Sequence, residues 1–212
     1  MSHLVTTLEP IERHQIARLL AKCPTVALRV GDICAHDDVP NASLLLVEEG
    51  ILVVASAPRA TRRMVLALAV DGGVLAPPRP GEQLTALADS ALIAITAEAR
   101  RALLEVPAAA EAIFGALVSA LWERQESLAQ FANVAHAERL REKLVQLARL
   151  HGRVVPEGVR VDLPLTHELL GQSVGSARET VTSAIGALER EGFLVRNGRS
   201  YLLAVSPASL AT

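Results

Sequence analysis

The chain has 212 residues, half of them hydrophobic and 21% charged, with a formal net charge of −2. This length fits one large or two small domains, and the apolar fraction is high enough to build packed cores. The sequence has no run of about 18 uncharged apolar residues and no apolar stretch at its polar N-terminus, so we expect neither a transmembrane helix nor a signal peptide. We therefore expect a cytoplasmic protein without a membrane partner.

The charge is distributed unevenly along the chain. Residues 1–135 hold 11 basic and 15 acidic residues, whereas residues 136–212 hold 10 basic and 8 acidic residues. The imbalance favours two domains, of which the second is able to approach a polyanion.

Cys23 and Cys34 are the only cysteines in the sequence. Two thiols are too few for a disulfide framework or for a four-thiolate iron–sulfur cluster. Together with His14 and His36 they leave open a heme site or a redox-active thiol pair. The alternative is a pair of buried structural cysteines with surface histidines, and we predict no cofactor or metal.

The first 95 residues change from helical periodicity to a strand-like pattern. Residues 9–21 repeat apolar positions at the spacing of a helix. Residues 23–95 alternate short apolar runs with turn residues about every ten residues, which predicts a small antiparallel sandwich or barrel.

Helical periodicity returns in residues 97–135, as a short segment that ends at Pro107 and a long segment after it. Along the long segment, side chains recur at alternating spacings of three and four, the pattern of a dimerisation seam. A helix packed on its own domain would show the same spacing, but about 25 residues span nearly 40 Å, more than a small domain needs. We therefore favour a homodimer. The seam residues are Phe114, Leu117, Leu121, Arg124, Leu128 and Phe131.

A further amphipathic helix is predicted for residues 136–151, and Gly152 ends it. Its inward-facing residues are expected to be Leu140, Leu144, Leu147 and Leu150. Residues 153–166 are expected to form a loop with at most one short strand. Two short helices follow at about 166–173 and 176–191.

The chain then ends in two β-rich runs separated by Asn197-Gly198, a strong signal for a two-residue hairpin turn. The order of helix, Gly175 turn, second helix and hairpin is that of a winged helix-turn-helix. On the second helix, Val181, Ile185 and Leu188 are expected to pack inward against Leu170 and Val174.

The opposite face of the second helix carries short polar side chains and one arginine, as a helix in the DNA major groove requires. These residues are Arg178, Glu179, Thr182 and Ser183. Arginine can bind guanine through two hydrogen bonds, and glutamate can accept from cytosine. Phosphate contacts are expected from Ser176, Thr180, and the wing residues Arg196 and Arg199, although solvated wing arginines would look the same.

Two residues in this region also fit purely structural roles. Ser176 and Glu179 form the S-x-x-E pattern of a capping box, so Glu179 can close the helix start instead of reading a base. Thr166 is expected to cap the first helix as well as to contact the DNA backbone.

The stretch LTHELLGQSVGSARETVTSAIGALEREGFLV resembles the helix-turn-helix signature of the Crp/Fnr family of bacterial regulators, which includes the cyclic-AMP receptor protein. The shared positions are Thr166, Gly171, Gly175, Arg178, Glu179, Thr180 and Val181. The resemblance implies that Arg178 and Glu179 read bases, with phosphates near Thr166, His167, Ser176 and Thr180. Ser183 departs from the cyclic-AMP receptor protein, which has a second base-reading arginine there.

By this resemblance the whole chain is expected to have an α+β fold. Its parts are an antiparallel, cyclic-nucleotide-binding-like β-roll in residues 1–106, a dimerisation helix in residues 107–135 and a winged helix-turn-helix in residues 136–212. The family's phosphate cassette, Gly-Glu-Leu followed by Arg-Ser, is missing, because Gly81-Glu82 is followed by glutamine and no Arg-Ser comes after it. A buried phosphodiester requires a paired cation. We therefore expect an effector other than a cyclic nucleotide and leave its identity open.

The leading interpretation is a homodimeric, sequence-specific transcription regulator that binds near-palindromic double-stranded DNA, with RNA polymerase as a further candidate partner. Two alternatives stay open: a constitutive DNA-binding dimer whose β-roll is only a platform, and a winged-helix module that binds another protein. The sequence offers no metal-ligand spacing, phosphate-binding loop or nucleophile motif, so we do not expect an enzyme.

Overall fold

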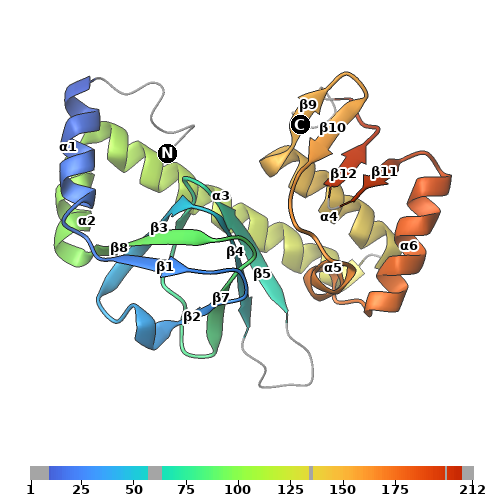
Figure 1. The fold of residues 1–212 in the computed structure, drawn as a ribbon, viewed down its shortest axis with the longest axis horizontal. Coiled ribbons are helices and arrows are strands. Elements are labelled where there is room, and N and C mark those ends of the chain that lie inside the picture. Colours follow the sequence, from blue (N-terminus) through green and yellow to red (C-terminus); the bar gives the residue numbers. More distant parts are fainter. Residues whose placement is uncertain (1–9, 57–63, 134–135, 199, 207–212) are drawn as a thin grey trace. The chain divides into compact units, whose positions relative to one another are not determined.

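The computed structural model describes residues 10–56, 64–133, 136–198 and 200–206. The chain forms two compact units, residues 1–126 and 127–212, which are treated separately below (Figure 1). We call them the N-terminal unit and the C-terminal unit.

Two four-stranded antiparallel sheets make up most of the N-terminal unit. In spatial order the first sheet contains β1 (Thr25–Leu28), β8 (Ser90–Thr96), β3 (Ala42–Glu49) and β6 (Val74–Leu75). The second contains β2 (Ile33–Ala35), β7 (Glu82–Ala86), β4 (Ile51–Ser56) and β5 (Val65–Val70), and a 3-10 turn, His36–Asp38, follows β2. The expected antiparallel β-roll is confirmed.

The inner faces of the two sheets share one aliphatic core. Alternate residues of each strand point into it, as the two-residue period of a strand requires. Six of its side chains have no exposed surface: Cys34, Leu45, Val47, Leu52, Leu84 and Leu92. The space between the sheets is therefore filled by the protein's own side chains.

Acidic side chains close the turns of this unit by accepting backbone N–H groups. The bonds run from Arg29 N to Asp32 (2.9 Å), Val30 N to Asp89 (3.0 Å), Ala35 N to Asp38 (2.7 Å), Gly50 N to Asp71 (2.6 Å) and Arg79 N to Glu82 (3.1 Å). Such bonds satisfy donors that the strand ends leave unpaired. Part of the negative charge of the N-terminal unit thus serves the turns.

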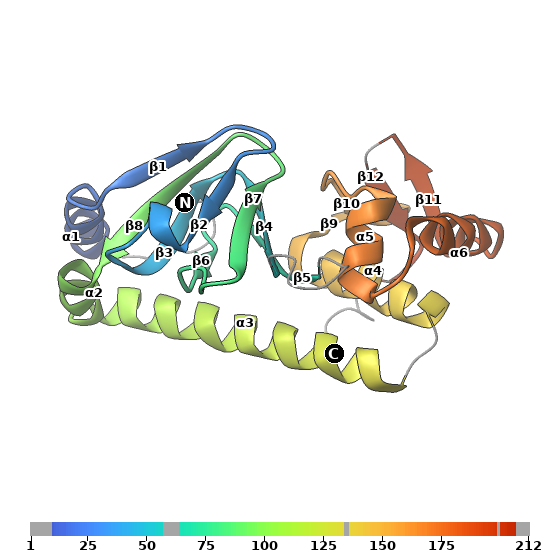
Figure 2. The ribbon, with the colours of Figure 1, turned by 90° about the horizontal axis from the view of Figure 1, so that it is seen from below.

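Three helices flank the first sheet: α1 (Pro10–Leu20), α2 (Ala97–Leu104) and α3 (Pro107–Asn133). Figure 2 shows α1 and α2 at one end of the strands and α3 running on from α2. Thr96 caps α2 by accepting from Ala99 N at 3.2 Å, and Pro107 stands at the first position of α3, where proline needs no donor. The outer face of the first sheet and these helices enclose a second apolar cluster, which includes Leu44, Ile95 and Leu103.

Among the described residues, no single helix is both long enough and apolar enough to cross a bilayer. Helix α2 and the first part of α3 reach that length and apolarity together, but the chain bends by 114° between them.

The C-terminal unit contains three helices and one four-stranded antiparallel sheet. The helices are α4 (His136–His151), α5 (His167–Val174) and α6 (Arg178–Arg190). The sheet order is β11 (Leu194–Asn197), β12 (Ser200–Leu203), β10 (Gly158–Val161) and β9 (Arg153–Val155). The winged helix-turn-helix architecture is confirmed.

Two local expectations for this unit are wrong. Residues 153–166 contain two paired strands rather than a loop with at most one, because β-branched residues on both sides of Pro156-Glu157 pair as a hairpin that is completed by β12. Leu140, Leu144 and Leu147 are buried as predicted, but Leu150 is 45% exposed. It lies in the last turn of α4, just before Gly152 ends the helix.

Candidate nucleic-acid interface

Helix α5 begins and ends at the residues that the sequence motif supplies. Thr166 caps its start, and the Thr166 hydroxyl accepts from Leu169 N at 3.1 Å. Gly175 ends it with a left-handed φ of 67°, which glycine adopts without steric cost. A Cβ at Gly171 would lie 2.7 Å from the Ser176 carbonyl oxygen, so the turn packs directly on the helix backbone. At both positions of the motif, a residue with a side chain would therefore be disfavoured on steric grounds.

Helix α6 has one buried and one exposed face, as predicted. Val181, Ile185 and Leu188 are at most 4% exposed and share the unit's interior with Leu170 and Val174. This burial fixes the rotation of α6 about its axis. The predicted base-reading residues Arg178, Glu179, Thr182 and Ser183 are all exposed, as is Thr180.

Ser176 does not form the expected capping box. The N-cap position of α6 is Ala177, whose side chain makes no capping hydrogen bond. Ser176 is only 6% exposed. The Ser176 hydroxyl lies 2.6 Å from Nδ1 of His136 on α4, and its N–H donates to the Gly171 carbonyl at 2.8 Å. Both polar groups therefore serve the fold, and the structure offers no outward-facing hydroxyl at Ser176 for a phosphate.

His167 joins three elements through its imidazole ring. Its Nδ1 lies 2.8 Å from the Thr182 hydroxyl on α6, and its Nε2 lies 3.2 Å from the Arg196 guanidinium on β11. The Thr182 hydroxyl donates to the Arg178 carbonyl at 2.9 Å, so it accepts from His167. The guanidinium can only donate. These bonds together select a neutral imidazole that is protonated at Nδ1.

The electrostatic surroundings of His167 favour the same neutral form. Burial lowers the pKa of His167, and the positive charges of Arg196 and Arg178 lower it further, while Glu189 acts in the opposite direction. His167 is a predicted phosphate contact, and its side chain also fixes the positions of Thr182 and Arg196.

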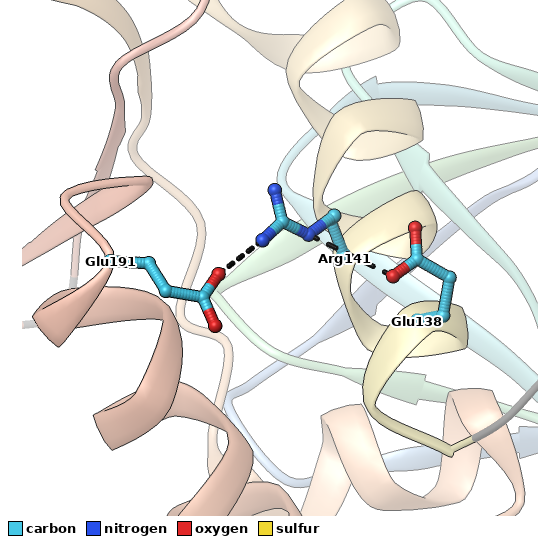
Figure 3. A network of polar contacts seen from close by, with 3 residues as sticks. All are labelled: Glu138, Arg141 and Glu191. Atoms are coloured by element: carbon cyan, nitrogen blue, oxygen red, sulfur yellow. Dashed lines mark hydrogen bonds and ion pairs between the residues drawn. The ribbon is translucent and has the colours of Figure 1, made fainter.

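An arginine on α4 holds the far end of α6 (Figure 3). Arg141 pairs with Glu191, the residue that ends α6, and its Nε lies 3.9 Å from the Glu138 carboxylate. The guanidinium also lies over the Phe193 ring, 4.4 Å from its centroid. Neither Arg141 nor His136 was predicted. Their partners are 50 and 40 residues away along the chain, so no local pattern reveals them.

The wing is the hairpin of β11 and β12. Asn197 pairs with Ser200, so Asn197 ends its strand rather than belonging to the turn. Gly198 has a φ of 62°. Arg196 is exposed next to His167, whereas the predicted phosphate contact Arg199 lies outside the described residues.

The long helix α3 carries apolar side chains on its surface. Phe114, Leu117 and Leu121 of the predicted seam are 71%, 39% and 56% exposed, and Trp122 is 66% exposed. On an adjacent face of the helix, Ala109 and Ile113 are buried in the second apolar cluster of the N-terminal unit. The side chains of the remaining seam residues, Arg124, Leu128 and Phe131, lie outside the described part of the structure.

The sequence of the C-terminal unit matches a known family over most of its length. Residues 138–212 match the family model of the Crp-like helix-turn-helix domain. These residues are therefore similar to Crp-like helix-turn-helix domains. The resemblance to the Crp/Fnr family is thereby confirmed for this Crp-like domain.

Curated relatives match part of the chain. The global nitrogen regulator of Synechococcus elongatus is 30% identical over 112 residues, which cover 53% of this chain and 50% of that protein. The global nitrogen regulator of Synechocystis sp. is 29% identical over 114 residues, 54% of this chain and 50% of that protein. The chain thus spans about half the length of the curated relatives it matches.

Solved structures show that the fold extends beyond the Crp-like domain. A CooA mutant from Carboxydothermus hydrogenoformans superposes with a TM-score of 0.77 at 22% identity, covering 92% of this chain and 88% of that one. A cyclic nucleotide-binding domain containing protein from Listeria monocytogenes superposes with a TM-score of 0.75 at 16% identity, covering 91% and 98%. These likenesses confirm the fold of a β-roll followed by a helix-turn-helix.

The two cysteines considered as a sensor lie in different apolar clusters. Cys23 and Cys34 are free and buried, each in a different apolar cluster. Burial, together with the charge of Asp38, raises the pKa of Cys34 to about 11, which suppresses the thiolate. His14 is exposed, and Nδ1 of His36 lies 3.0 Å from the Pro78 carbonyl. The burial of both thiols favours structural cysteines over a reactive pair.

Proposed function

We propose that this chain is a homodimeric regulator of transcription that reads a near-palindromic DNA site with helix α6. The observation that carries the proposal is the exposed face of α6, where Arg178, Glu179, Thr182 and Ser183 project from a helix whose opposite face is buried. A recognition helix needs its donors and acceptors on short stems near its N-terminus, and these four residues lie in its first two turns.

The contacts around α6 support this proposal, because a base-reading helix must be held in a fixed orientation. His167 holds the first half of α6 through Thr182, and Arg141 holds its end through Glu191. Arg178 and Arg196 place two positive charges beside His167 on the exposed side of the domain. Such charges attract the phosphates that flank a base-reading contact.

The exposed side chains of α3 support the homodimer. Phe114, Leu117 and Leu121 repeat at spacings of three and four and remain exposed in the single chain. Apolar residues that recur in this way along a long helix bury themselves against a second copy. A two-fold dimer presents two α6 helices, which explains the near-palindromic site.

We propose no cyclic nucleotide as effector and no enzymatic activity. Glu82 and Asp89, in the segment where the family places its phosphate cassette, use their carboxylates to close turns. Two carboxylates close to this segment would repel a phosphodiester rather than bind it. The curated relatives are regulators, and the outward face of α6 is a surface suited to binding DNA.

Selection of binding sites from random double-stranded DNA tests this function. The purified chain should enrich near-palindromes whose half-sites are about one helical turn apart. Arg178→Ala should reduce affinity for the selected site by about 1–3 kcal/mol and relax preference at one guanine per half-site.

Arg190→Ala is the matched control. Arg190 is an exposed arginine in the last turn of the same helix, where its Nε donates to the Gly186 carbonyl at 3.1 Å. Its replacement removes the same charge and should leave base preference intact. Equal effects of the two substitutions, or enrichment of no sequence at all, would show that α6 does not read DNA.

A further inference from the structure

The second apolar cluster of the N-terminal unit contains a cavity of about 310 Å³. It lies among one face of α1, the first turns of α3 and the side of the first sheet that faces the helices. Sheet residues Leu46, Val74 and Ile93 form its floor, and Ile16 and Leu20 of α1 face it. The cavity is therefore on the opposite side of the first sheet from the filled core between the two sheets.

The walls of the cavity are mainly apolar. Eight of its nineteen lining residues are at most 9% exposed, among them Cys23, Val74, Ile95, Leu103, Ala109 and Ile113. Among the described residues that line it, the charged ones are Arg13 and Glu48, both exposed. Their opposite signs leave the lining without net charge. The charges thus lie at the rim, and the interior offers aliphatic contacts.

Helix α1 does not close this core as a helix on a sheet normally does. Ile16, Leu19 and Leu20 are only partly buried, and Ala17 and Ala21, which also line the cavity, are exposed. The cavity is thus partly open to solvent, and its apolar walls lack the packing contacts that an occupant would supply. The core between the sheets, by contrast, holds six side chains with no exposed surface.

We propose that this cavity binds a small, uncharged, apolar molecule. A dry apolar cavity of about 150 Å³ accepts benzene, so about twice that volume suits a molecule of two fused or linked rings or a comparable aliphatic chain. A charged ligand would lose its hydration against aliphatic walls and find no net charge in return. The chemistry of the cavity therefore differs from that of a cyclic-nucleotide site.

The position of the cavity connects it with α3. Ala108, Ala109 and Ala112 line it from the first two turns of this helix, and Phe114 and Leu117 of the proposed dimer seam follow within the next turn and a half. An occupant would pack against the segment of α3 from which the seam starts. The idea that this occupant regulates DNA binding rests on the proposed function. Binding of the occupant in the cavity does not depend on that function.

Titration of the full chain with the uncharged fluorophore N-phenyl-1-naphthylamine, without DNA, tests occupancy. We expect saturable binding with one site per chain. Ala112→Leu places a larger side chain into the cavity and should weaken binding at least tenfold. The control Ala110→Leu changes a partly buried alanine of the same helix that does not line the cavity, and it should leave the affinity unchanged.

A second cavity variant protects the test against misfolding. If Ala112→Leu lowers the Tm, Ala17→Leu, on the exposed side of α1, fills the cavity from its rim and should weaken binding in the same way. Absence of saturable binding, or equal binding by the wild type and both cavity variants, would overturn the proposal. Binding only after deletion of residues 1–9 would assign the cavity to the chain's own N-terminus and would also overturn it.

The selected DNA site separates this proposal from the proposed function. If probe binding is saturable but no DNA sequence is enriched, the cavity site stands and the DNA-binding function fails. If a sequence is enriched but the probe does not bind, the DNA-binding function stands and the cavity site fails. If both occur, the change in DNA affinity on addition of the probe, and its loss in Ala112→Leu, measures the coupling between the two sites.

Discussion

In the C-terminal unit, polar side chains project from α6 and are held by partners on other elements, whereas in the N-terminal unit acidic side chains accept backbone N–H groups of the turns. Thr182 is fixed by His167 and points outward. Asp71 and Asp89 instead accept backbone N–H groups at 2.6 and 3.0 Å. One unit presents hydrogen-bonding groups to a polar partner, and the other presents an apolar cavity.

This difference indicates how binding is divided between the units. Recognition of DNA needs exposed donors and acceptors at fixed positions, and the C-terminal unit has both. The N-terminal unit has retained the β-roll, but its central core is filled, and its open space lies among aliphatic side chains behind the first sheet. A similar overall fold to known regulators is therefore compatible with a different class of effector.

The largest expected effect comes from breaking the dimer. Leu121→Asp places a carboxylate in the apolar seam, so the chain should become monomeric by analytical ultracentrifugation. Loss of the second α6 should then reduce affinity for a palindromic site by roughly 10²–10⁴-fold, because the two half-sites no longer act together.

Ser119→Asp is the control for this substitution. Ser119 is exposed on the same helix but off the seam, so the dimer and the DNA affinity should both persist. An unchanged dimer in Leu121→Asp would place the interface elsewhere.

A smaller effect is expected from acid on the C-terminal unit. Burial lowers the pKa of His151 from 6.5 to about 4, and the positive charge of Lys143 contributes. The unfolded chain therefore takes up a proton at a higher pH than the folded chain does. The free energy of unfolding should fall as the pH is lowered from about 6.5 to about 4, by up to about 3 kcal/mol, and this contribution should be complete above pH 6.5.

Denaturant unfolding between pH 4 and 7 measures this dependence. His151→Leu removes the titrating group and should flatten the curve in that range. A curve of the same slope in His151→Leu would assign the acid sensitivity to other groups.

The contacts of His167 should have a still smaller effect, because each is worth about 0.5–1.5 kcal/mol. His167→Gln keeps an acceptor for Arg196, whereas His167→Asn keeps a donor for Thr182 and loses Arg196. If Arg196 has to be positioned for DNA, affinity for the selected site should fall by roughly 2–10-fold in His167→Asn and less in His167→Gln.

Nitrogen NMR of the imidazole gives an independent readout. His167 should be the Nδ1–H tautomer at pH 7, and Arg196→Ala should raise its pKa, because a neighbouring positive charge is removed. A cationic ring at pH 7 would contradict this account of the junction.

Cyclic nucleotides are expected to have no effect on this protein. Calorimetry with cyclic AMP and cyclic GMP up to millimolar concentration should show no saturable binding, and neither should change DNA affinity. Binding at micromolar concentration that is lost in Arg124→Ala would overturn this prediction and make α3 the nucleotide sensor.

The sequence predicted the features that depend on neighbouring residues. Gly171, Gly175 and Thr166 define the turn and the cap of α5, and periodicity alone locates both faces of α6, because in each case the interacting groups lie within a few residues. The boundaries of α5 and α6 followed from these signals.

Features that depend on distant residues were missed. The inward position of Ser176 requires His136 on α4, and the contacts of Arg141 require the end of α6. The β9–β10 hairpin is stabilised by pairing with β12, about 40 residues later, so residues 153–166 alone carry only a weak strand signal. The cavity is likewise a property of packing, because the same alanines on α3 could have lain against larger neighbours.

We expect Arg178 to read a guanine, and a cycle of substitutions in protein and DNA tests this contact. The affinities of the wild type and of Arg178→Ala are measured for the selected site and for the same site with 7-deazaguanine, which lacks the N7 acceptor, at the guanine in question. The account predicts that the wild type loses affinity on the modified site while Arg178→Ala loses none. Equal losses in both proteins would contradict it, because the N7 contact would then not involve Arg178.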